Sequence, residues 1–253
     1  MYAAERQQRI LTVARAAGRV EVLALAEELD VSPETIRRDL TNLERGGALR
    51  RVHGGAIPVE RLGFEPSVAI RSERFVAEKE RIAKAALALV PDEGTILLDS
   101  GTTTLALAKI LPTDRELTVV TNSLPIVQAL SSVKAISLYV LGGRFRPRTQ
   151  AAVGDWVVSA LTDVTVDIAF LGTNGVSVER GLTTPDPSEA LAKHAMAAAA
   201  RQCAVLADSS KVGTEHFSRF ASLEDLSVLV TDTGLDLETA QEFEAHGPEV
   251  IRA

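Results

Sequence analysis

The sequence predicts an α/β protein in which a small helical domain with a β wing precedes a larger domain built on a mostly parallel sheet. Apolar residues near position 40 recur at helical spacing, a strand-like run with glycines follows, and from residue 75 apolar strands alternate with helical stretches. The predicted domains are residues 1–57 and 75–253. Residues 58–74 are predicted to link them, because two prolines and Gly63 favour a hinge.

The first domain is predicted to hold three short helices. The first two are expected at about 3–17 and 21–29, with a break at Gly18. The third begins after Ser32, whose hydroxyl can accept a backbone N–H, and Pro33 suits the first helical position, where no amide hydrogen is needed. Spacings of four and three form its apolar stripe, made of Ile36, Leu40 and Leu43. Its other faces carry Glu34, Thr35, Arg37, Arg38 and Thr41.

A turn followed by a capped helix with exposed Thr and Arg side chains is typical of a helix-turn-helix that reads DNA. The helix is expected to end near Gly46 and Gly47, and the strand-like residues 48–52 with a turn at 53–56 then predict a β wing. We therefore expect a winged helix-turn-helix. The expected DNA-binding residues are Ser32, Thr35, Arg37 and Arg38 of the helix, with Arg50, Arg51 and His53 of the wing holding mainly phosphates.

Net charge alone does not predict DNA binding, because the chain carries −7. The charge is unevenly distributed, since residues 1–57 contain nine arginines and eight acidic residues, a net charge of +1, and the remainder carries −8. The prediction therefore depends on where the arginines lie. Arg37 and Arg38 share the third helix, and Arg45, Arg50 and Arg51 follow it closely.

Composition narrows the remaining classes of function. With 253 residues, 46% hydrophobic and 24% charged, the chain is typical of a globular protein with more than one domain. It has no apolar run of about 18 residues and no apolar segment of a secretory signal, so we expect a cytoplasmic protein with no membrane partner. Cys203, the single cysteine, excludes an internal disulfide, and no spacing of metal-ligand residues predicts a metal site.

The second domain is predicted to be Rossmann-like, because its apolar strands alternate with helices. Strands are expected at 95–99, 117–121, 136–140, 167–171, 203–207 and 227–231, and helices at about 76–89, 102–110, 124–130, 153–161 and 187–200. Ligands of such sheets collect at the carboxyl ends of the strands. The loops that follow the strands are therefore the expected binding site.

One of these loops has the features of a phosphate site. Asp99-Ser-Gly-Thr-Thr-Thr104 leaves a strand and enters a helix, so it offers backbone N–H groups, hydroxyls and the positive end of a helix dipole. It lacks the Walker A lysine and the GxGxxG pattern, which argues against a nucleoside triphosphatase or a dinucleotide enzyme. An ordinary capped helix start is the alternative interpretation.

Other loops converge on the same sheet edge. A lysine there can pair with phosphate, and Asp or Asn can bind sugar hydroxyls, although a lysine after a strand can also be a solvated surface residue. The expected effector-binding residues are Lys79, Asp99, Ser100, Gly101, Thr102, Thr103, Asn122, Gly142, Gly143, Asn174, Glu189, Asp208 and Lys211.

Both halves of the chain resemble the DeoR family of bacterial transcriptional repressors. The N-terminal resemblance lies in Val31-Ser-Pro-Glu-Thr-Ile-Arg-Arg-Asp-Leu40 and Gly47-Ala-Leu-Arg-Arg-Val-His-Gly-Gly-Ala56. The C-terminal resemblance lies in Asp99–Thr103, Thr121–Ser123, Leu141–Gly143 and Ala207–Lys211. It implies a repressor of carbohydrate-use genes that acts as a homo-oligomer, a dimer or tetramer, on operator DNA and is released by a phosphorylated sugar. No cofactor is expected.

The second half also resembles ribose-5-phosphate isomerase, at Asp99–Thr103 and Asp208–Lys211. The catalytic Gly-Ala-Asp-Glu and Lys-Gly-Gly-Gly loops of that family correspond here to Gly172-Thr-Asn-Gly175 and a segment near Gly181-Leu-Thr-Thr184. Glu189 can match a further acidic residue, as a ligand of sugar hydroxyls or simply as a helix-start residue. With no pair of proton-transferring groups, we expect no catalysis. The alternatives are an isomerase-like enzyme tethered to DNA and an architectural DNA binder with an inert second domain.

Overall fold

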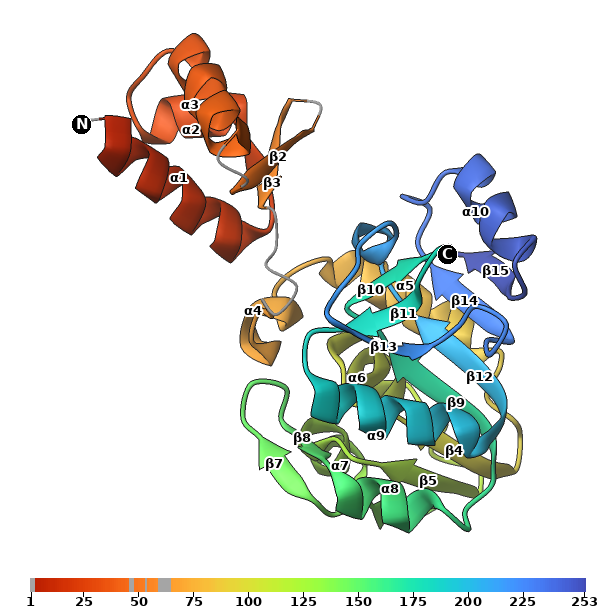
Figure 1. The fold of residues 1–253 in the computed structure, drawn as a ribbon. Coiled ribbons are helices and arrows are strands. Elements are labelled where there is room, and N and C mark those ends of the chain that lie inside the picture. Colours follow the sequence, from red (N-terminus) through yellow and green to blue (C-terminus); the bar gives the residue numbers. More distant parts are fainter. Residues whose placement is uncertain (1–2, 46–47, 53, 59–64) are drawn as a thin grey trace. The chain divides into compact units, whose positions relative to one another are not determined.

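The computed structural model describes residues 3–45, 48–52, 54–58 and 65–253, and it confirms the predicted fold class. The chain divides into two compact units, Met1–Phe64 and Glu65–Ala253 (Figure 1). Residues 65–74, predicted as part of the linker, lie in the second unit, where Val68–Ser72 forms helix α4. The second unit thus starts earlier than the predicted residue 75, because polar contacts described below fix its first residues.

The first unit packs three helices against a small antiparallel sheet. The helices are α1 (Ala3–Ala17), α2 (Val22–Glu28) and α3 (Pro33–Arg45), and the sheet order is β1 (Val20–Glu21), β3 (Gly55–Pro58), β2 (Leu49–Val52). Each element contributes apolar side chains to one core, as Ile10, Leu25, Leu40 and Leu49 show. The β2–β3 hairpin is the predicted wing.

The second unit is built on a seven-stranded parallel sheet with the order β15-β14-β12-β9-β4-β5-β6. Its strands are β4 (Gly94–Leu98), β5 (Leu117–Thr121), β6 (Ile136–Val140), β9 (Val166–Gly172), β12 (Ala200–Leu206), β14 (Val228–Thr231) and β15 (Glu249–Arg252). The order of the strands around β4 explains where a ligand can bind. The chain runs outward through β5 and β6 and then returns to place β9 on the opposite side of β4, so the loops after β4 and β9 diverge.

Helices cover both faces of this sheet. One face carries α5 (Val76–Leu87), α6 (Thr102–Lys109) and α7 (Leu124–Leu130), which bury residues against Ile96 and Leu98 of β4. The other carries α8 (Asp155–Leu161), α9 (Pro187–Ala198) and α10 (Leu237–Glu244), which pack against Leu97 and Leu171. The inner strands β4, β9, β12 and β14 are largely buried on both faces and carry apolar runs.

Two small antiparallel sheets complete the second unit. They are the hairpin of β7 (Arg144–Arg146) and β8 (Ala151–Val153), and a sheet of β10 (Gly175–Ser177), β11 (Gly181–Thr184) and β13 (Ser218–Ala221). A 3-10 turn, η1 (Ser209–Lys211), follows β12. Of the helices in the described ranges, none is long and apolar enough to cross a bilayer.

Candidate functional site

Helix α3 begins as the sequence predicts. The Ser32 hydroxyl accepts a hydrogen bond from the Thr35 backbone N–H at 3.2 Å, and Pro33 occupies the first turn. Arg37 and Arg38 are exposed, and the Arg37 guanidinium lies 3.0 Å from a Glu34 carboxylate oxygen. The exposed face of α3 therefore presents both arginines to solvent, where a DNA groove can be contacted.

A buried carboxylate fixes α3 against α1. Asp39 is 3% exposed, and it accepts hydrogen bonds from Arg6 at 2.5 Å and from Gln7 at 2.9 Å. Paired charges are the usual way for a carboxylate to be buried. The Asp39 side chain therefore helps to set the position of the helix that carries the two exposed arginines.

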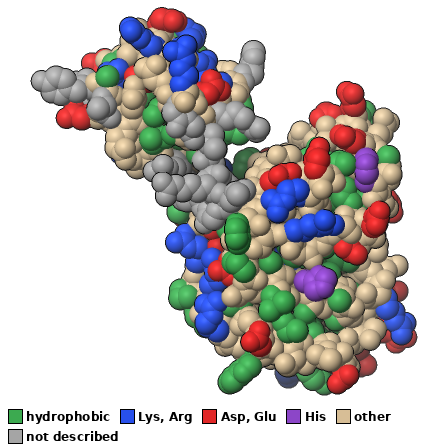
Figure 2. Space-filling model, in the orientation of Figure 1, with side chains coloured by type: hydrophobic (Ala, Val, Ile, Leu, Met, Phe, Trp, Pro, Cys, Tyr) green, Lys and Arg blue, Asp and Glu red, His purple; other side chains and the backbone are tan. Residues whose placement is uncertain are grey.

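Of the predicted wing residues, Arg51 is the one whose side chain the structure describes. Arg51 donates to the Thr41 hydroxyl at 3.0 Å and to the Arg37 carbonyl at 3.3 Å, and its backbone N–H donates to Glu44. Arg51 thus holds the wing against α3. The side chain of Arg50 and all of His53 lie outside the residues that the structure describes. Figure 2 shows blue Lys and Arg side chains interspersed with red acidic ones on the first unit, in keeping with its small net charge.

A cavity lies at the carboxyl ends of β4, β9 and β12, at the point where the sheet order reverses. Its walls are the loop from β4 into α6, the residues after β9, the turn η1, the first turns of α9, and the segment that leads into α5. The lining residues are Pro66, Arg71, Arg74, Phe75, Lys79, Ser100, Gly101, Thr102, Thr103, Thr149, Gly172, Thr173, Asn174, Glu189, Lys193, Leu206, Ala207, Asp208 and Lys211.

Most of the predicted effector residues meet in this cavity. Those that line it are Lys79, Ser100, Gly101, Thr102, Thr103, Asn174, Glu189, Asp208 and Lys211. The other four, Asp99, Asn122, Gly142 and Gly143, do not line it. At Gly143 the backbone φ of +153° and a Cβ that would meet the Val153 carbonyl at 2.8 Å explain the glycine by local packing.

Asp99 holds a buried lysine that forms part of the cavity wall. Its carboxylate is 1% exposed, pairs with the Lys193 ammonium and accepts a hydrogen bond from the Gly172 N–H at 3.0 Å. Lys193 also donates to the Gly172 carbonyl at 2.9 Å. Burial raises the pKa of Asp99, and the neighbouring Lys193 charge opposes that shift. The pair ties β4 to α9 across the end of β9.

Asn122 holds the Ser100–Thr103 loop in place through hydrogen bonds. Its side-chain oxygen accepts a hydrogen bond from the Ser100 backbone N–H at 3.0 Å, and its amide donates to the Ala152 carbonyl at 2.9 Å. The side chain thus consumes one backbone donor of the loop and links it to β8. Asn174 has a similar internal partner, since it accepts a hydrogen bond from Thr184 at 2.9 Å.

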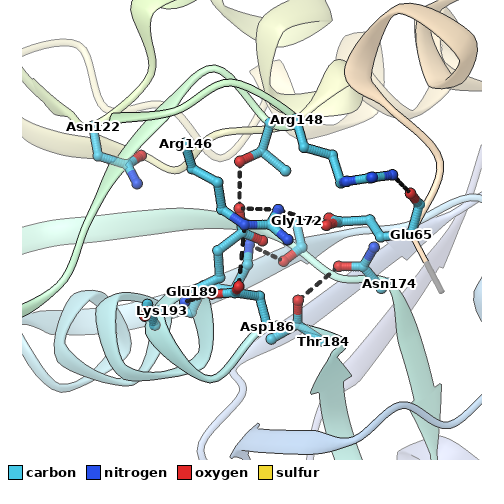
Figure 3. A network of polar contacts seen from close by, with 12 residues as sticks. Glu65, Asn122, Arg146, Arg148, Gly172, Asn174, Thr184, Asp186, Glu189 and Lys193 are labelled. Carbon is cyan, nitrogen blue, oxygen red and sulfur yellow. Dashed lines mark hydrogen bonds and ion pairs between the residues drawn. The ribbon is translucent and has the colours of Figure 1, made fainter. Parts of the chain in front are cut away.

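Glu189 belongs to a polar network that connects the cavity to the start of the second unit (Figure 3). Arg146, at the end of β7, is its centre, with carboxylate oxygens of Glu65, Asp186 and Glu189 at 2.5, 3.2 and 3.2 Å. Thr149 donates a hydrogen bond to Glu189, and Arg148 donates to the Glu65 carbonyl. Burial and the nearby Glu189 charge raise the pKa of Glu65.

The position of Glu189 bears on both roles expected for it. This residue sits in the first turn of α9, where its backbone N–H is capped by Asp186 at 3.0 Å, while its side chain lines the cavity. Both alternatives raised from the sequence are therefore compatible with its position. Its carboxylate is 4% exposed and is already engaged by Arg146 and Thr149.

The lining residues that the sequence did not identify include Arg71, Arg74, Thr149 and Lys193. Lys193 could have been found, because it follows Glu189 by four residues and so lies on the same face of a helix. The others had no such signal. Arg71 and Arg74 fall in the region expected to be linker, and Thr149 lies in the turn of a hairpin that the apolar pattern did not predict.

Both units of the chain match a known family. Two family models match the chain, the DeoR-like helix-turn-helix domain over residues 6–61 and the DeoR C terminal sensor domain over residues 74–233. The chain belongs to the DeoR family. It is a DNA-binding transcriptional regulator rather than an enzyme, and its second unit is a DeoR sensor domain.

Full-length relatives agree with this assignment. The DeoR-family chain is 40% identical over 232 residues to the uncharacterized HTH-type transcriptional regulator FruR of Bacillus subtilis, covering 92% of each chain. It is 36% identical to the HTH-type transcriptional regulator GlpR of Haloferax volcanii, covering 99% of this chain and 98% of that one. It is 34% identical to the HTH-type transcriptional repressor GlcR of Bacillus subtilis, with coverages of 92% and 89%.

Solved structures give a more distant likeness. Ribose 5-phosphate isomerase A of Methanocaldococcus jannaschii aligns with 55% of this chain and 55% of its own, at 21% identity and a TM-score of 0.41. At this distance the likeness implies nothing about the activity of the DeoR-family chain.

Proposed function

We propose that this DeoR-family regulator represses genes of carbohydrate use and leaves its operator when a phosphorylated sugar binds the second unit. The observation that carries the proposal is the cavity at the reversal of the sheet order, where the Ser100–Thr103 loop and the N-terminus of α6 meet Lys79 and Lys211. Backbone donors, a helix dipole and ammonium groups together suit a phosphate. Asp208 and Glu189 supply acceptors for sugar hydroxyls.

On the DNA side, the proposal gives α3 the reading role. Arg37 and Arg38 are exposed on one helix, and Thr35 lies in its first turn, as major-groove contacts require. We assign the base-edge and nearby phosphate contacts to these residues and to Ser32. Arg50 and His53 are proposed to hold phosphates. Arg51, whose guanidinium faces α3, is assigned the positioning of the wing.

Control of DNA binding is proposed to pass through the hinge between the units. A homo-oligomer places paired recognition helices at a spacing that fits successive major grooves, and closure around the effector changes that spacing. The relatives named as repressors, such as GlcR, support the sign of this regulation. The effector must therefore bind the released state more tightly than the operator-bound state.

A screen for operator release tests this function. The full chain is bound to operator DNA at fixed salt and titrated with a panel of sugar phosphates, each beside its unphosphorylated sugar. Release by a phosphorylated sugar, but not by its neutral counterpart, is the expected result. If no member of the panel changes operator affinity, the second unit is not a sugar-phosphate sensor.

The Lys211→Ala variant refines the test. We expect it to bind operator with the wild-type affinity and to need a higher effector concentration for release, because Lys211 lines the cavity and lies far in sequence from residues 32–53. The matched control is Lys84→Ala, an exposed lysine on α5 outside the cavity lining. Release of Lys211→Ala at the wild-type effector concentration would contradict the role of this lysine.

A further inference from the structure

The first residues of the second unit form one wall of the cavity. We call residues 65–75 the junction segment, because they follow directly after the first unit in the chain. Four of them line the cavity: Pro66, Arg71, Arg74 and Phe75. The sequence pattern assigned residues 65–74 to the linker, and the function proposed above does not use the side chains of this segment.

The junction segment is held firmly in the second unit. Glu65 is 2% exposed and pairs with Arg146 at 2.5 Å. The Val68 N–H donates to the Arg148 carbonyl at 2.9 Å, and α4 packs against α6. Lys79 donates to the carbonyls of Arg71 and Arg74, the latter at 2.6 Å. The two arginines are therefore placed at the cavity by contacts that do not involve their guanidinium groups.

Neither guanidinium makes an ion pair within 4.0 Å among the described residues, although the charge of Arg71 acts on Glu65 and lowers the pKa of that carboxyl. The Nε atom of Arg71 is inaccessible to solvent and makes no hydrogen bond, and no ion pair joins Arg71 to the nearby Glu65. The Arg74 guanidinium lies 5.6 Å from the centre of the Phe75 ring and makes no ion pair in the described part of the chain. Buried donors are usually satisfied, so the unpartnered Nε of Arg71 at the cavity wall indicates a missing acceptor.

The positive charges of this wall are also close to one another. Burial and the charges of Lys211, Arg71 and Arg74 lower the pKa of Lys79 to about 8, against the opposing effect of Asp208. Four cationic groups therefore lie at the cavity, those of Lys79, Lys211, Arg71 and Arg74. Asp208 is the carboxylate that raises the pKa of Lys79. An anion with two negative charges would relieve this repulsion.

We propose that Arg71 and Arg74 are direct ligands of a phosphate monoester dianion, which they hold against the Ser100–Thr103 loop so that the bound effector bridges the junction segment and the sheet. This inference rests on the proposed function and specifies it. The planar guanidinium offers paired donors that match phosphate oxygens. Effector binding then fixes the residues that follow the DNA-binding unit. The junction segment is therefore the part of the second unit that responds directly to an occupied cavity.

The test uses inorganic phosphate as the probe and the full chain throughout. Phosphate is titrated into the wild type and into Arg71→Gln/Arg74→Gln at constant ionic strength, set with chloride, and binding is measured as a rise in unfolding temperature. We expect the double variant to bind phosphate at least about tenfold more weakly, since each lost charged hydrogen bond is worth roughly that factor.

Three further variants separate ligand contact from other effects. Arg81→Gln removes an exposed arginine of α5 and controls for net charge. Arg148→Gln removes an arginine that holds the Glu65 carbonyl but does not line the cavity, so it controls for anchoring of the segment. Arg71→Lys/Arg74→Lys keeps both charges and is expected to retain part of the phosphate affinity, which keeps the test usable if the Gln variant does not fold.

Each outcome either supports or overturns direct contact between the two arginines and phosphate. Weaker phosphate binding in the Gln variant, with near wild-type binding in Arg81→Gln and Arg148→Gln, supports direct contact. Unchanged binding in the Gln variant, or an equal loss in either control, overturns the inference and leaves the proposed function standing. If the wild type itself is not stabilised by phosphate, this inference is overturned, and the operator-release screen alone decides the proposed function.

Discussion

Arg38 is the clearest single residue on which to test DNA reading. It is exposed on α3 and has no ion pair with a described residue, whereas Arg37 pairs with Glu34. We expect Arg38→Ala to weaken operator binding by about 1–3 kcal/mol and to reduce the preference for operator over random DNA. Titrations at fixed salt measure both. The control is Arg9→Ala, an exposed arginine of α1, and equal losses in the two variants would mean that Arg38 contributes only charge.

Lys79 predicts how effector affinity depends on pH. Burial and neighbouring cations lower its pKa to about 8, so the ammonium form that favours an anion is lost as the pH rises through 8. Phosphate esters are already dianionic above about pH 7. We therefore expect phosphate affinity to fall about three- to tenfold between pH 7 and pH 9.5. The same titration on Lys79→Met should give a flatter profile, and an equally steep fall there would assign the pH dependence to another group.

At the scale of elements, α9 is joined to β4 by the Asp99–Lys193 pair. Lys193→Met removes the cation that faces a buried carboxylate and should destabilise the second unit by about 3–5 kcal/mol. Chemical unfolding followed by circular dichroism measures this. Lys84→Met, which changes an exposed lysine of α5, is the matched control and should cost little.

The sign of the pH effect in this variant is fixed by burial. Burial raises the pKa of Asp99 above its usual 3.8, so the folded chain binds a proton more readily than the unfolded chain. The proton bound to Asp99 therefore adds to the free energy of unfolding at low pH. This contribution is lost as the pH rises through the pKa of Asp99 in the folded chain. The deficit of Lys193→Met should therefore be largest at neutral pH and shrink on acidification. A deficit that is constant with pH would show that Asp99 does not carry it.

The same elements show which parts of the structure the sequence could predict. The strands β5 and β6 coincide with the predicted 117–121 and 136–140, because both are short runs rich in β-branched, aromatic and other apolar residues. The edge strand β15 (Glu249–Arg252) and the short strands β10, β11 and β13 were missed, since charged ends and lengths of three or four residues leave no clear period.

The sequence could predict which loops bound the cavity, but it could predict less well which side chains face into it. Residues that directly follow strands, such as Ser100 and Asp208, are placed by topology alone. Whether a polar side chain there faces the cavity or the protein depends on neighbours far away in sequence. Asp99 faces inward because Lys193 lies on α9, and Asn122 does so because the carbonyl of Ala152 comes from β8.

At the scale of the whole molecule, repression and sensing must be coupled thermodynamically. If effector binding weakens operator binding by some factor, operator DNA must weaken effector binding by the same factor, and such couplings are commonly about 1–3 kcal/mol. We expect equal factors when the releasing sugar phosphate is titrated with and without a saturating operator duplex, and when operator is titrated with and without saturating effector. The chain with Ser100→Ala/Thr102→Ala should lose most of the effector affinity and keep the operator affinity, because these residues line the cavity of the second unit. Effector affinities that are identical with and without operator would mean that the second unit does not regulate the first.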